Sequence, residues 1–382
     1  MDKDRSLRET VAAVTASTDA PETKLRKLYE RVQKIRNLTY QPAQDKTEQD
    51  RLEENRNVED ILRRGYADDR HINILFAALV RAAGLKSWVV LTADRDSTFF
   101  SPARHQYSSL TETLVLVDVS GQERFYDPGT LYCPFGTVSW EKTGMQGLRL
   151  TKDGGRWLMV PIPTAADSET RRILRLREVD GSMLEGTLHL VLTGQEAISR
   201  RQESSEDDDL DRSKALEDEV REWLPDGSSV EVLKAGPWNQ PEPPLEADLH
   251  VRISGMVART ARRMILPLSV LRAGTLPPLY HPGRIHDVDL QYPYQETDEV
   301  RLQLPKGYER VLLPAPHKIE NGFARFETTH QAGNGEIVFE RRETVTGYLF
   351  KGPQQRARLL EYFYATRIAD EDRTVLYATE AR

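Results

Sequence analysis

A periodic helix followed directly by two strand patterns limits the fold of the first 150 residues. Apolar residues at positions 72, 75, 76, 79 and 80 recur at the spacing of one helix face, and Gly84 ends the segment. Residues 87–92 and 113–119 are typical of strands, and 123–126 returns as a third strand after a Ser-Gly turn. Helices followed by an antiparallel hairpin predict an α+β layer.

Helix signals also precede this segment. Leu25, Leu28 and Val32 recur at helical spacing after Pro21. Asn57 has the position of an N-cap for a short helix that Gly65 ends.

The remainder of the chain is mostly β in pattern. Residues 151–170 resemble a connection, because they contain a Gly-Gly turn and several prolines. Beyond it, short strands recur around one amphipathic helix at 211–224, and a last helix after Pro353 carries Ala357, Leu360 and Tyr364 on one face. We therefore expect a core at 1–150, a β-rich domain at 151–284, and C-terminal strands with a helix at 285–382; the last two parts can form one unit.

Composition excludes several classes of protein. Cys133 is the single cysteine, which excludes an intrachain disulfide framework and cysteine-based zinc sites. The formal net charge of −7, without a basic stripe, argues against nucleic acid as a partner. No apolar run approaches the roughly 20 residues that cross a bilayer, and the N-terminus lacks the apolar region of a signal peptide. The expectation is a soluble chain that is not exported.

Three short motifs carry a resemblance to a known family. Residues 65–70 (GYADDR) are followed by an apolar helix at 75–84, and residues 125–130 (FYDPGT) end a strand. Together they resemble the transglutaminase-like superfamily, which has a papain-like fold. The chain is most similar to bacterial proteins in which such a core accompanies β-rich domains of the DUF3857 type, with 292–296 and 370–376 resembling their C-terminal part. That family is often exported, so a periplasmic location is implied if the N-terminus is truncated.

The resemblance implies a Cys-His-Asp set, which this chain does not retain. The nucleophile position falls at Asp69, the His position at Glu112 and the Asp position at Asp127. In the family, a Cys at a helix N-terminus is activated by the His, which the Asp orients. A carboxylate at Asp69 cannot form a thioester, and the ordinary interpretation of Asp69 is a helix N-cap.

Other residues offer alternatives to this set. Cys133 follows a Pro/Gly turn and is expected to be a buried, inert thiol, whereas His105 lies in a loop from which it could reach a cleft. His71 is expected on the first helical turn, partly exposed. If Asp69, Glu112 and Asp127 converge, they raise a pKa or bind a hard cation such as Ca²⁺ or Mg²⁺; no other cofactor is indicated.

The sequence therefore favours a non-catalytic transglutaminase-like protein, a pseudoenzyme, that serves as a binding or scaffolding module. Its partner would be a protein or peptide in the ancestral active-site cleft, since such clefts hold extended chains. The alternative is a hydrolase or transferase that uses the displaced Cys133 and His105, or the carboxylates Asp69, Glu112 and Asp127.

Overall fold

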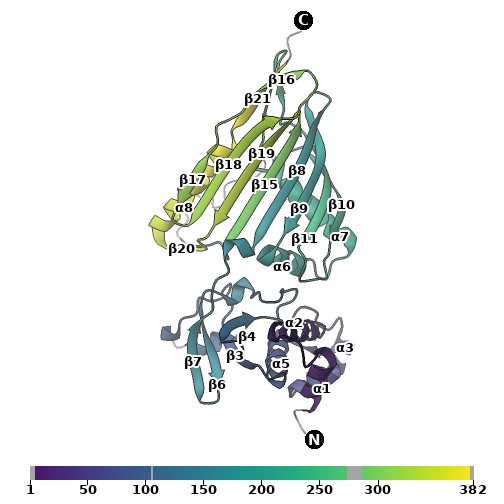
Figure 1. The fold of residues 1–382 in the computed structure, drawn as a ribbon, viewed down its shortest axis with the longest axis vertical. Helices are drawn as coiled ribbons and strands as arrows, with labels where there is room; N and C mark the ends of the chain where they lie inside the picture. The colour runs from purple at the N-terminus through teal and green to yellow at the C-terminus, as the bar shows by residue number, and fades with distance from the viewer. Residues whose placement is uncertain (1–4, 105, 273–285, 379–382) are drawn as a thin grey trace. The chain divides into compact units, whose positions relative to one another are not determined.

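The chain divides into two compact units. The structure, a computed structural model, describes residues 5–104, 106–272 and 286–378 (Figure 1). Unit 1 comprises Met1–Pro163, Ile198–Ser205 and Gln240–Glu242, and unit 2 comprises Thr164–Ala197, Glu206–Asn239 and Pro243–Arg382. The three-part division expected from the sequence stays a prediction.

Unit 1 joins a group of helices to an antiparallel sheet. The helices are α1 (Arg5–Val14), α2 (Pro21–Val32), α3 (Lys46–Arg51), α4 (Val58–Arg64) and α5 (Asp69–Ala82). The five-stranded sheet has the order β5-β4-β3-β6-β7, formed by β3 (Lys86–Thr92), β4 (Glu112–Val119), β5 (Gln122–Tyr126), β6 (Gln146–Thr151) and β7 (Gly154–Met159). A short parallel pair, β1 (Arg36–Asn37) and β2 (Tyr66–Ala67), ties the helical segments together.

Local sequence accounts for most of these elements. The Asn57 side chain accepts a hydrogen bond from the Asp60 amide at 2.9 Å, which caps α4, and Gly65 ends that helix at φ 78°. Gly84 likewise follows α5 with φ 84°. The apolar face of α5 packs against the strand residues Val115 and Val117. The predicted helices and strands of this unit are confirmed, and with them the α+β class.

One element of this unit differs from the expectation. Residues 154–159, assigned to a connection, form β7, which pairs with β6 from Gln146↔Met159 to Thr151↔Gly154. The Gly-Gly turn closes this hairpin, and Trp157 packs onto a small core with Phe100. The turn was therefore predicted correctly, but the strand that follows it was not. Strand β7 is mostly exposed and lacks the alternation of apolar and polar residues that marks a strand.

Unit 2 is dominated by a large sheet. Its order is β10-β11-β9-β8-β15-β19-β18-β17, and every pairing is antiparallel except β8 with β15 (Figure 1). The strands are β8 (Glu169–Val179), β9 (Met183–Leu192), β10 (Ser229–Gly236), β11 (Leu245–Ile253), β15 (Tyr294–Gln303), β17 (Lys318–Asn321), β18 (Ala324–Gly333) and β19 (Glu336–Val345).

Smaller elements complete unit 2. A four-stranded sheet contains β12 (Ala258–Arg259), β13 (Arg263–Pro267), β21 (Arg373–Ala378) and β16 (Tyr308–Leu312), and β14 (Val288–Asp289) pairs with β20 (Leu349–Phe350). The helices are α6 (Gly194–Glu203), of which residues 198–203 belong to unit 1, α7 (Asp209–Trp223) and α8 (Gly352–Asp370). The helix predicted at 211–224 is α7. No helix of the described part of the chain is long and apolar enough to span a membrane.

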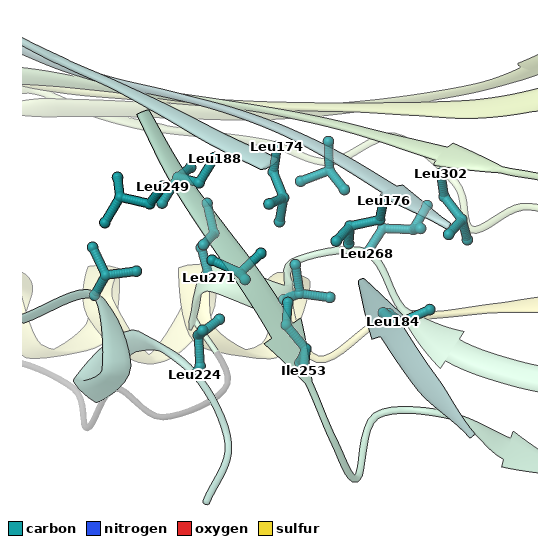
Figure 2. Packing of buried hydrophobic residues seen from close by; sticks show 14 of the residues in the cluster. Leu174, Leu176, Leu184, Leu188, Leu224, Leu249, Ile253, Leu268, Leu271 and Leu302 are labelled. Atoms are coloured by element: carbon teal, nitrogen blue, oxygen red, sulfur yellow. The ribbon is translucent and has the colours of Figure 1, made fainter. Parts of the chain in front are cut away.

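A leucine-rich core lies on one face of the large sheet. Leu174, Leu188 and Leu249 project from it toward other apolar side chains, as Figure 2 shows. Met264 and Leu376 bring the four-stranded sheet into the same core. This arrangement explains the alternating pattern of the long strands, because one residue in two faces the core.

Helix α8 covers a second, smaller core. Leu359, Tyr362 and Phe363 pack against Phe326 and Val345. The face predicted from Ala357, Leu360 and Tyr364 is wrong, since Ala357 and Tyr364 are exposed. The helix is apolar on several sides, so its periodicity does not identify the buried face.

Charged side chains interrupt the inner face of the sheet near α8. Arg172 Nη1 lies 2.9 Å from Asp298 Oδ1, and Arg341 Nε lies 3.0 Å from Asp370 Oδ1. Arg172, Asp298 and Arg341 are all buried. This ion network fixes the position of α8 through Asp370, because a buried charge that loses its partner is costly.

Candidate functional site: an ion cluster around Lys142

Asp69 is the first residue of α5. The N-cap is its neighbour Asp68, whose carboxylate accepts a hydrogen bond from the His71 amide at 2.7 Å. The expectation that Asp69 itself caps the helix is therefore wrong by one residue, because both positions carry the same side chain. Asp69 Oδ1 instead accepts a hydrogen bond from Thr39 Oγ1 at 3.0 Å. Its carboxylate is thus free of the capping role and turns toward the sheet.

The other two carboxylates come from strand ends. Glu112 begins β4, and Asp127 directly follows β5. Asp127 is fully buried. Its oxygens accept hydrogen bonds from Thr130 Oγ1 at 2.6 Å and from Asn73 Nδ2 at 2.9 Å. Asp127 is therefore held rigidly between α5 and the loop that follows β5.

Lys142 brings the three carboxylates together. Its Nζ lies 3.1 Å from Asp127 Oδ1, 3.6 Å from Glu112 Oε2 and 4.0 Å from Asp69 Oδ2. The Lys142 side chain is only 5% exposed, whereas those of Asp69 and Glu112 keep 13% and 21% of their surface exposed. The ammonium thus lies at the inner side of the cluster, and two of the carboxylates reach solvent.

Charge and burial act in opposite directions in this cluster. Burial alone would lower the pKa of Lys142, but the carboxylates, Asp127 first, raise it well above its ordinary value. Burial raises the pKa of Glu112, and the attraction of Lys142 only partly offsets that effect. Burial also raises the pKa of Tyr40, which borders the cluster. Lys142 therefore stays charged, and the pKa of Glu112 lies above its ordinary value.

Asn73 and Gly129 hold the site together. The Asn73 side chain donates to the Thr113 carbonyl at 2.8 Å and accepts from the Gly129 amide at 2.9 Å. Asn37 Nδ2 donates to the Gly129 carbonyl at 2.7 Å. A Cβ on Gly129 would lie 2.2 Å from the Asp69 carbonyl oxygen, so only glycine permits this approach. The start of α5 is therefore locked to the loop that carries Asp127.

Cys133 and His71 make their hydrogen bonds outside this cluster. Cys133 is buried, its Sγ donates to the Thr137 carbonyl at 3.3 Å, and burial raises its pKa well above the usual range. The prediction of a buried thiol is confirmed. His71 lies on the first turn of α5, half exposed, with Nδ1 2.8 Å from Asp68 Oδ1, as predicted. His105 lies outside the described residues.

Lys142 is the one member of the cluster that the sequence did not reveal. It lies in a short 3-10 turn, Trp140–Lys142, that carries no periodic pattern. A lysine in such a loop is ordinarily exposed. No sequence signal distinguishes this buried lysine from the exposed ones.

The three carboxylates were also considered as ligands for a metal cation. Among the described residues, no group of three or more His, Cys, Asp or Glu has the geometry of a metal site. The ammonium of Lys142 contacts all three carboxylates and supplies there the positive charge that Ca²⁺ or Mg²⁺ would supply. A cation at this position would have to displace it.

Comparisons with known proteins concern two segments of the sequence and the fold. Residues 8–117 match the model of the transglutaminase-like superfamily, and residues 262–375 match a domain of unknown function with a solved structure, DUF3858. No curated protein matches the sequence significantly. Unit 1 thus contains a transglutaminase-like core, and a β-rich region follows it. The association with DUF3857 stays a prediction.

One solved structure resembles the chain over most of its length. It is a crystal structure of a protein described as a "putative protease" from Parabacteroides distasonis ATCC 8503, with a TM-score of 0.53 and 11% identity. The similarity covers 98% of this chain but 55% of the other, so this chain spans about half the length of that protein. At this identity the likeness concerns the fold alone.

Proposed function

We propose that this chain is a non-catalytic transglutaminase-like protein that acts as a binding or scaffolding module. The observation that supports the proposal is the contact of Lys142 Nζ with Asp69, Glu112 and Asp127, the positions to which the resemblance assigns the catalytic set. Acyl transfer through a thioester needs a thiolate and a base beside it. Carboxylates at these three positions supply no thiolate.

The binding role follows from what the cluster leaves accessible. The side chains of Asp69 and Glu112 are partly exposed, so a segment of another protein can reach them without disturbing Lys142. Three carboxylates against one ammonium leave an excess of negative charge at the cluster. We therefore propose a peptide or protein segment as the partner.

A peptide library gives a direct test, because binding and turnover can be read in one experiment. The full chain is incubated with the library, and mass spectrometry measures both retained and altered peptides. We expect retention that weakens at least tenfold in an Asp69→Asn, Glu112→Gln variant, without cleavage or amine incorporation. Cleavage or cross-linking that the same variant lacks would contradict the proposal. The absence of any retained peptide would equally contradict it.

A second candidate is a hydrolase that uses the carboxylates. The observation in its favour is Glu112, whose pKa burial raises while its side chain remains partly exposed, as a general acid requires. Turnover would then fall as the pH rises through the pKa of Glu112, and Glu112→Gln would abolish it. A pH profile unaffected by this substitution would exclude the carboxylate mechanism.

The remaining alternative uses the displaced residues Cys133 and His105. Alkylation of Cys133 by iodoacetamide, with loss of any turnover, would favour it. Burial and a raised pKa of the thiol speak against this alternative.

A further inference from the structure

The large sheet of unit 2 bears a basin on the face opposite its leucine core. Leu174 and Leu176 of β8 are buried in that core, so the residues between and beside them, Arg175 and Arg177, project from the other face. The basin has a volume of about 570 Å³ and is open to solvent. It lies where β9, β8 and β15 run side by side (Figure 1), next to the β18–β19 turn at Asn334. A hollow of this size accommodates a small molecule.

Two arginines lie directly opposite one another in this basin. Arg175 of β8 pairs in register with Arg301 of β15. Like charges at opposite positions destabilise a sheet unless something compensates them. Arg301 is compensated, because its guanidinium contacts Glu299 at 2.6 Å and Glu336 at 3.1 Å. Arg175 has no ion pair or side-chain hydrogen bond within the described residues, so its charge is left to solvent or to a ligand.

The other arginine of the basin is also satisfied. Arg177 contacts Glu185 at 2.5 Å. The two glutamates of the lining, Glu185 and Glu336, are therefore engaged by Arg177 and Arg301. Arg175 is therefore the one arginine of the lining whose guanidinium has no ion-pair partner among the described residues.

Uncharged donors surround this free guanidinium. Thr187 is the cross-strand partner of Arg175 on β9, and Gln303 lies two residues beyond Arg301 on β15. The side chains of Thr187, Gln303 and Asn334 make no hydrogen bond to any residue that the structure describes. The basin thus offers one guanidinium group without an ion-pair partner and several neutral polar side chains. Such a combination of groups suits the binding of a polar anion.

We propose that this basin binds a small molecule through a carboxylate or phosphate oxyanion, with Arg175 as its principal contact. The guanidinium plane matches either group by two parallel hydrogen bonds. The hydroxyl of Thr187 and the amides of Gln303 and Asn334 hold the rest of the ligand. The bound anion also removes the repulsion between Arg175 and Arg301.

Calorimetric titration of the full chain with inorganic phosphate and, separately, with citrate tests the site at constant ionic strength set by chloride. We expect saturable binding of at least one probe, weakened at least tenfold by Arg175→Gln. Preference for phosphate or for citrate identifies which oxyanion the site takes. Absence of saturable binding by both, or equal affinity of wild type and R175Q, would overturn the proposal.

Arg171→Gln is the matched control, because Arg171 lies on the same strand and the same face but outside the basin. R171Q should bind like the wild type. In chloride alone, R175Q should unfold at a temperature equal to or above that of the wild type, since the like-charge pair is gone. A lower midpoint for R175Q than for the wild type would assign Arg175 a structural role and overturn the proposal.

Discussion

Lys142 Nζ lies 3.1 Å from Asp127 Oδ1, and both side chains are buried. The pair joins the 3-10 turn Trp140–Lys142 to the residue that follows β5. Asn73 and Thr130 donate further hydrogen bonds to the Asp127 carboxylate. Removal of one partner of such an ion pair strongly destabilises the fold, because the remaining charge is then buried without a counter-charge. The pair is therefore the structural centre of the cluster.

Replacement of Lys142 by Met should destabilise unit 1 by about 3–5 kcal/mol, as for removal of one partner of a buried ion pair. Asp127 would remain buried without its cation. Urea unfolding followed by circular dichroism measures the effect. Lys152→Met is the matched control, since Lys152 lies in the exposed β6–β7 turn, and it should change stability by less than about 0.5 kcal/mol. A K142M variant as stable as K152M would contradict the ion-pair interpretation.

Gly129→Ala should disrupt the same site from the backbone side. The added Cβ would lie 2.2 Å from the Asp69 carbonyl oxygen and 2.9 Å from Asn73 Nδ2, so α5 must move. Thermal unfolding should show a loss of several degrees, and hydrogen exchange should accelerate in the first turn of α5. Gly322→Ala, where a Cβ meets no atom within 4 Å, is the control and should leave both unchanged. If hydrogen exchange in α5 is as slow in G129A as in the wild type, the close contact between residue 129 and the start of α5 is not essential.

Cys133 should react slowly with thiol reagents. Burial raises its pKa well above the usual range, so little thiolate exists at pH 8, and the side chain is inaccessible. Labelling by Ellman's reagent should be at least 100-fold slower in the native protein than in denaturant. Rapid native labelling would revive the thiol alternative to the proposed function.

Unit 2 should lose stability in acid through Glu296 and Asp298. Burial alone would raise the pKa of these two acids, but the neighbouring guanidinium groups hold both pKa values below their usual range. The two carboxylates contribute fully to the free energy of unfolding at pH values above their pKa in the unfolded chain, about 4. This contribution is lost as the pH falls through the lower pKa values of the folded state. Hydrogen exchange in β15, followed from pH 7 to pH 3 with correction for intrinsic rates, measures the beginning of this loss below pH 4.

Glu296→Gln should flatten this acid dependence. The variant removes one of the two depressed carboxyls and should also be destabilised at neutral pH. Glu340→Gln, at an exposed position on β19, should keep the wild-type profile. An identical acid slope in E296Q and the wild type would exclude Glu296 as its source.

Much of the fold could be predicted from local pattern. Asn57, Gly65 and Gly84 mark helix ends because their side chains or positive φ values satisfy backbone geometry by themselves. The apolar patterns of residues 87–92, 113–119 and 123–126 predicted the strands that the structure shows as β3, β4 and β5. Strand β7 was missed because it is largely exposed. Helix α8 was predicted, but its buried face was not, because the helix is apolar on several sides.

The sequence by itself determined that carboxylates occupy positions 69, 112 and 127 and that the single thiol is at position 133. The assignment of the three carboxylates to the family's Cys, His and Asp positions stays a prediction from the resemblance. Only the tertiary structure decided what these carboxylates contact. Lys142 reaches them from a turn without any pattern, and a contact between residues 15 to 73 positions apart depends on how sheet and helix pack. The same holds for Arg175 and Arg301, which strand register alone places side by side.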